Sequence, residues 1–162
     1  MKSWCLNFSL PWYNREMIVN KEARRDYDIL DTLVAGIMLS GAEVKSLREG
    51  RGNMKGAHAK ILGKEVFLLG LDLPKYTHYA GIEYDSKRTR KLLLKRAQID
   101  KLIQKMEGKA LTLVPLRLFF GGRWAKIEIG IGRGKKEYEK REMIKKRDIE
   151  REISAAMKKS LR

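Results

Sequence analysis

Cysteine, histidine and proline are scarce in this chain, and it has no long apolar run. One cysteine in 162 residues excludes an internal disulfide framework and is typical of a reducing compartment, so we expect a cytoplasmic protein. With only two histidines beside it, no cysteine and histidine group has the spacing of a metal site. We therefore expect neither a metal nor a cofactor. No stretch approaches the roughly 20 apolar residues that a membrane-spanning helix needs.

The sequence also lacks the local signatures of an enzyme. It has no glycine-rich phosphate loop ending in Lys-Ser or Lys-Thr, no GxSxG, and no cysteine and histidine pair suited to a triad. The glycine-rich stretch 130–134 follows a strand-like run, which favours a flexible joint over a nucleotide site. Asp26, Asp28 and Asp31 alternate with apolar residues, as on a solvated strand face. We predict a protein that is not an enzyme.

Positive charge is what the chain has in excess. Its 36 Lys and Arg residues against 20 Asp and Glu residues give a net charge of +16, which predicts a polyanionic partner. An anionic membrane is the competing partner. It is less favoured because acidic residues are interleaved through the C-terminal segment, and its apolar stripe contains neither Trp nor Phe.

The last thirty residues, 133–162, form a separate basic tail. Within it Ile149, Ile153 and Met157 recur every four residues, a stripe too narrow to bury against a globular core. An isolated helix of this length is marginal in water. Two interpretations stay open: a solvated helix that frays, or a segment that is disordered when free and becomes helical on a polyanion.

The first sixteen residues differ from the rest, with four aromatic residues gathered around Pro11. They do not form a signal peptide, because Asn7 and Pro11 interrupt the apolar core that such a peptide requires. We expect an extension of doubtful order over residues 1–19, or a natural start at Met17.

The intervening residues, 20–132, predict a small barrel of antiparallel strands. An opening strand covers 26–39, and two hairpins, 57–69 and 111–131, turn at Gly63-Lys64 and at Gly121-Gly122. About six strands result. Because closure removes exposed edges, we expect a mainly β, OB-fold-like closed barrel.

Two to three helices should pack on this barrel. Ser40 and Glu43 form a capping box that starts a helix, which Gly50 can close. A second helix is predicted over 96–107 from the spacing of its apolar residues. Pro115 cannot donate to a strand ladder, so it should lie at an edge or a bulge.

Four stretches of the sequence, in order and widely separated, resemble one known family. They are GAEVKSLREG at 41–50, RTRKLLL at 88–94, TLVPLRLFF at 112–120 and GKKEYEKRE at 134–142. They resemble small protein B (SmpB), the tmRNA-binding (SsrA RNA-binding) family of bacterial trans-translation, from about residue 20 to residue 158. The resemblance implies an OB-like barrel with added helices.

The resemblance also implies a function in ribosome rescue. A member binds the tRNA-like domain of tmRNA and delivers it to ribosomes stalled without a stop codon. Its C-terminal tail lies in the decoding centre and the empty mRNA channel. We therefore expect tmRNA and the ribosome as partners of a protein that is itself a monomer.

Carried over position by position, the resemblance implies two sets of site residues. The RNA-binding set is Asn20, Lys21, Arg24, Tyr27, Glu43, Lys45, Arg48, Arg88, Arg90, Lys91, Lys135 and Lys136. The set for the decoding centre is Tyr138, Glu139, Lys140, Arg141, Ala156 and Met157. Tyr138 stands where some members have His, and Glu139 where Asp is usual.

Physical chemistry fits most of the RNA-binding set. The basic residues can pair with phosphates, and Tyr27 can stack on an exposed base. The four basic residues between 87 and 91 repel one another unless a partner neutralises them. Glu43 would itself be repelled by phosphate unless it accepts from a base or a ribose hydroxyl, and its role in the capping box is equally plausible.

Two other functions remain as alternatives. A general single-stranded nucleic-acid-binding OB-fold protein would use a basic groove and stacking aromatics. Against it, Phe119, Phe120 and Trp124 cluster around one hairpin turn and do not line several strands. A structural ribosomal protein is the third class, which would be present on all ribosomes.

Overall fold

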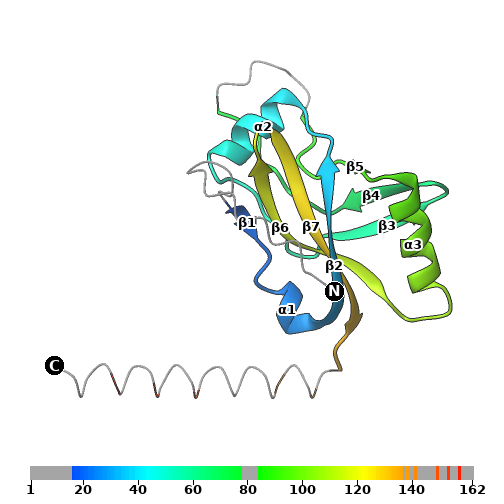
Figure 1. The fold of residues 1–162 in the computed structure, drawn as a ribbon. Helices are drawn as coiled ribbons and strands as arrows, with labels where there is room; N and C mark the ends of the chain where they lie inside the picture. Colours follow the sequence, from blue (N-terminus) through cyan, green and yellow to red (C-terminus); the bar gives the residue numbers. More distant parts are fainter. Residues whose placement is uncertain are drawn as a thin grey trace.

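A computed structural model of the chain describes residues 16–77 and 84–136, together with five separate positions of the tail: Tyr138, Arg141, Ile149, Ile153 and Met157. In these residues seven strands and three short helices follow one another (Figure 1). The strands are β1 (Glu16–Val19), β2 (Tyr27–Ile37), β3 (His58–Leu62), β4 (Glu65–Leu69), β5 (Arg90–Leu93), β6 (Thr112–Gly121) and β7 (Trp124–Gly134). The helices are α1 (Ala23–Asp26), α2 (Gly41–Arg48) and α3 (Arg96–Met106).

Six of the strands close into a barrel. The order β6-β3-β4-β5-β2-β7 returns to its start because β7 also pairs with β6, and every pairing is antiparallel. The seventh strand, β1, adds to β6 through residues 117–119. The predicted OB-like barrel of about six strands with two to three helices is confirmed.

The local signals that predicted these elements lie where they were expected. The hairpins turn at Gly63 and Gly122, whose φ angles of 60° and 68° favour glycine. Ser40 and Glu43 cap α2 reciprocally: Ser40 Oγ accepts from the Glu43 amide at 3.4 Å, and Glu43 Oε2 accepts from the Ser40 amide at 2.6 Å. Pro115 adjoins a bulge in the β6–β7 register, as its missing N–H requires.

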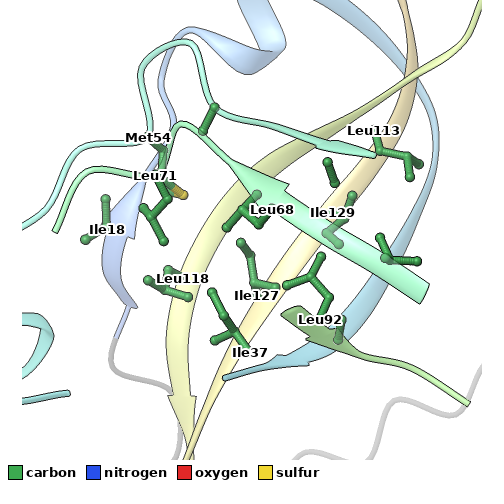
Figure 2. Close-up of a cluster of buried hydrophobic side chains, with 14 of the residues drawn as sticks. Ile18, Ile37, Met54, Leu68, Leu71, Leu92, Leu113, Leu118, Ile127 and Ile129 are labelled. Atoms are coloured by element: carbon green, nitrogen blue, oxygen red, sulfur yellow. The ribbon is translucent and has the colours of Figure 1, made fainter. Parts of the chain in front are cut away.

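The core fills the inside of the barrel. Leu68 of β4, Leu118 of β6 and Ile127 of β7 are fully buried and lie among side chains from the other strands (Figure 2). One strand, β7, carries most of the long-range pairing. β7 bonds to β2 from Gly134 to Lys126, and to β6 from Gly132 to Trp124.

Strand pairing reaches beyond 20–132 at both ends. β1 takes up residues 16–19, which were expected to belong to an extension of doubtful order, and β7 continues to Gly134. The predicted extension otherwise lies outside the described residues. Among the described residues, no helix has the length and apolar composition that crossing a membrane requires.

Candidate nucleic-acid interface

The predicted RNA-binding residues lie at the two ends of the barrel. One group gathers around α1, the start of β2 and the end of β7, and the other around α2 and β5 (Figure 1). β2 runs from the first group to the second, and its 11 residues span roughly 30 Å at the usual rise of a strand. Two separate cationic surfaces are therefore available on the barrel.

At the first end, Lys21 and Arg24 are exposed and line a surface hollow of about 500 Å³ beside β6. Neither side chain forms an ion pair or a hydrogen bond with the residues that the structure describes. Arg117, across the hollow, is paired with Glu128 and lies over the Phe119 ring at 5.3 Å. Lys21 and Arg24 can thus donate hydrogen bonds to phosphate oxygens at little desolvation cost.

Asn20 holds α1 in place. Its amide nitrogen donates to the carbonyl oxygens of Met54 and Pro115 at 3.3 and 3.0 Å. Its oxygen accepts from the backbone amides of Glu22 and Ala23, at 3.2 Å each. Because both ends of the amide are engaged inside the protein, Asn20 positions the neighbouring cations.

The tail begins at the same end of the barrel. Tyr27, half-buried at the start of β2, pairs with Gly134 of β7. The next residue, Lys135, donates from its backbone amide to the Asp26 carbonyl at 2.9 Å and from Nζ to the Arg24 carbonyl at 3.0 Å. Lys135 therefore fixes the direction in which the chain leaves the barrel.

At the second end, two arginines share one buried carboxylate. Glu43 and Arg90 are both 0% exposed, and Arg90 Nη2 lies 2.8 Å from Glu43 Oε1. Arg88 donates from Nε to Oε1 at 2.8 Å and from Nη2 to Oε2 at 2.5 Å. The repulsion expected among the basic residues of this stretch is thus relieved inside the protein, by a carboxylate some 45 residues away in the sequence.

Two of the predicted RNA contacts need correction. Glu43 and Arg90 were expected at an RNA surface, but their side chains are buried and neutralise each other. Of the two roles left open for Glu43, the structure shows the capping box, to which it adds the ion pairs. The sequence did contain a signal for the burial of Arg90. Arg90 and Leu92 are two positions apart in β5, so both side chains point to the inner side of the strand.

Other predicted cations of this end remain at the surface. Lys45 and Arg48 are exposed on α2, with Lys45 over the Tyr76 ring at 5.3 Å and Arg48 over the Phe120 ring at 5.7 Å. Lys91, on β5, forms an ion pair with Glu65 in which both side chains are over a third exposed. Sequence reasoning missed these aromatic and acidic partners, which lie on other elements.

The pKa values of Glu43 and Arg88 are shifted in opposite directions, and each shift favours the charged form of its group. Burial by itself would raise the pKa of Glu43. The hydrogen bonds from Arg88 and the Ser40 amide, together with the positive charges of Arg90 and Arg88, outweigh burial and hold that pKa below its ordinary value. The hydrogen bond to Glu43 likewise raises the pKa of Arg88. Both shifts favour the charged forms of Glu43 and Arg88 at neutral pH.

This arrangement predicts how stability depends on pH. Because the pKa of Glu43 is lower in the folded than in the unfolded protein, the ionised carboxylate stabilises the fold above its ordinary pKa of 4.5. That stability is lost as pH falls through the lower, folded value. We expect the difference in unfolding free energy between the wild type and Glu43→Gln, measured by urea titration, to shrink from pH 5 towards pH 3. A constant difference over that range would contradict the assignment.

Half of the predicted decoding-centre set can be located. Tyr138, Arg141 and Met157 are helical and exposed, whereas Glu139, Lys140 and Ala156 lie outside the described residues. The apolar stripe of the tail, Ile149, Ile153 and Met157, is at least half exposed at each position. Within the described residues, no group of acidic, histidine or cysteine side chains could hold a metal ion.

Comparison with known proteins places both the barrel and the tail in one family. The SmpB protein family model matches residues 17–159. The SsrA-binding protein of Salinispora tropica is 48% identical over 137 residues, 85% of this chain and 86% of that protein. The SsrA-binding protein of Chloroflexus aggregans is 47% identical over 144 residues, 88% of this chain and 91% of that protein. A chain in a solved structure of tmRNA-SmpB and the bacterial ribosome is 43% identical, with a TM-score of 0.63, over 74% of this chain and 85% of that one. The chain therefore belongs to the SmpB family.

Proposed function

We propose that this protein is a cytoplasmic, monomeric adaptor of trans-translation that is not an enzyme. It binds the tRNA-like domain of tmRNA and brings it to stalled ribosomes. The family match carries this proposal, because it spans residues 17–159 and so includes the barrel and most of the tail. The relatives are SsrA-binding proteins, and the structural neighbour comes from a tmRNA-SmpB ribosome structure.

The barrel offers the contacts that such a role needs. Lys21 and Arg24, near the start of β2, and Lys45, Arg48 and Arg88, near its far end, present positive charge at two separate places on the barrel. Two separated contact points suit a folded RNA of fixed shape, since an unstructured strand gains nothing from their spacing. Phosphate contacts of this kind position an RNA and do not read its bases.

The tail supplies the second half of the function. It leaves the barrel beside α1, and Ile149, Ile153 and Met157 of its apolar stripe are at least half exposed. In the proposed role Tyr138, Glu139, Lys140 and Arg141 lie in the decoding centre. Ala156 and Met157 lie farther along the empty mRNA channel.

A competition titration tests the RNA partner. Labelled RNA that copies a tRNA-like acceptor arm and elbow is bound at near-physiological salt, then challenged with unlabelled copies or with unstructured RNA of equal length. We expect the folded competitor to be about a hundredfold more effective, or about 2.7 kcal/mol. Equal competition would instead indicate a general single-stranded nucleic-acid-binding protein.

Two variants make the titration residue-specific. Arg24→Gln should weaken binding and reduce the slope of log affinity against log salt by about one phosphate contact. Lys101→Gln removes an equal charge on the exposed side of α3, which carries none of the predicted RNA-binding residues. If the two variants lose equal affinity, bulk charge and not the α1 surface binds the RNA.

A further inference from the structure

The two arginines on Glu43 differ in what they leave exposed. Arg90 is fully buried, and each of its three guanidinium nitrogens has a partner inside the protein. Nε donates to Glu43 Oε1 at 2.9 Å, Nη1 to the carbonyls of Leu71 and Arg88 at 2.5 and 2.9 Å, and Nη2 to the Ser86 carbonyl at 2.8 Å. Nothing on this side chain is left for an RNA.

Arg88 is oriented by the same carboxylate but reaches the surface. Its Nε and Nη2 donate to Glu43, and Nη2 also lies 3.4 Å from the Met38 carbonyl. Its Nη1 has no partner among the described residues, and the side chain is 39% exposed. Glu43 thus holds one edge of the Arg88 guanidinium inward and leaves the other facing outward.

Arg90 also fixes the backbone from which Arg88 projects. Its backbone partners lie at the two ends of the segment that joins β4 to β5: Leu71 follows β4, and Ser86 and Arg88 precede β5. The same two ends are joined by the Leu73 amide, which donates to the Ser86 carbonyl at 3.0 Å, and by the Tyr84 hydroxyl, which donates to the Leu73 carbonyl at 2.7 Å. The planar fork of arginine can serve several acceptors at once, and lysine cannot.

We propose that Arg88 is the residue of this stretch that contacts RNA phosphate, and that Glu43 and Arg90 are positioning residues that orient it without touching RNA. This inference rests on the proposed function, because it assigns roles within the same RNA interface. An oriented guanidinium loses little side-chain freedom on binding, which favours a charge-assisted bond to phosphate.

Conservative lysine variants separate the two roles in the tRNA-like RNA titration. Arg88→Lys keeps a charge at the surface and should weaken binding by no more than about fivefold. Arg90→Lys keeps the charge but loses the fork, and should weaken binding by about tenfold or more through misplacement of Arg88. Adding Arg88→Gln to Arg90→Lys should then cost little more, since both act through one contact. Additive losses, or full binding by Arg90→Lys, would overturn the inference.

An NMR titration of the wild-type protein tests the roles of Arg88 and Arg90 even if Arg90→Lys fails to fold. The Nε–H resonances of the arginines are followed by NMR as the tRNA-like RNA is added. We expect the Arg88 resonance to move and that of Arg90 to stay. If Arg90 moves as much as Arg88, the division of roles is wrong. If the RNA does not bind at all, the proposed function fails, and this outcome differs from equal movement of the two arginine resonances, which contradicts only the division of roles.

Discussion

A chain that ends at Lys136 is expected to bind the tRNA-like RNA almost normally and to lose ribosome rescue. The shortened chain retains all of β7, the Lys135 contacts with α1 and both cationic ends of the barrel. RNA affinity should therefore change by no more than about threefold. Addition of the tmRNA-encoded tag on ribosomes stalled at a message without a stop codon should fall by about a hundredfold or more, or about 2.7 kcal/mol.

The two readouts must be made on the same preparations, with a melting curve to show that the barrel is intact. Ile153→Ala is the matched variant, because it keeps the length and charge of the tail and trims one exposed position of the apolar stripe. It should retain part of the tagging activity. Loss of RNA binding by a folded, shortened chain would show that the tail is part of the RNA interface.

Neutralising Glu43 is expected to cause the largest loss of stability among single-charge changes on this barrel. Glu43→Gln preserves shape but leaves Arg90, which is 0% exposed, beside no carboxylate. Breaking a buried ion pair in this way costs about 3–5 kcal/mol, as measured by urea unfolding at neutral pH.

Glu65→Gln provides the matched control. It removes the partner of Lys91, the residue next to Arg90 in the same strand, but that pair is 40% and 45% exposed. Exposed ion pairs contribute about 0–1 kcal/mol, so this variant should unfold almost like the wild type. If the free energy of unfolding falls equally in both variants, the buried ion pairs of Glu43 contribute no more to stability than the exposed pair of Glu65.

The fold was predictable wherever a local signal determined it. The glycine turns of the two hairpins, the Ser40–Glu43 capping box and the Pro115 bulge each depend on residues that are close in the sequence. β1 was missed because four residues give too little alternation to recognise. The partner of β1, at residues 117–119, lies about a hundred positions away.

The candidate site was predictable only as a set of residue types. Family resemblance located Lys21, Arg24, Lys45, Arg48 and Arg88, which the structure leaves at least partly exposed. It could not separate Arg88 from Arg90, because both are arginines two positions apart. Their difference depends on a carboxylate brought in by α2, and such pairing becomes visible only in three dimensions.

The position of β7 has a mechanical consequence for the tail. Its hydrogen bonds to β2 and β6 run across the strand, along nearly its whole length. A force that draws the tail away along the direction of β7 would load those bonds in shear, so many of them must break together. Because β7 is paired on both sides, tension on the tail would move the whole barrel before it could pull β7 out of the sheet.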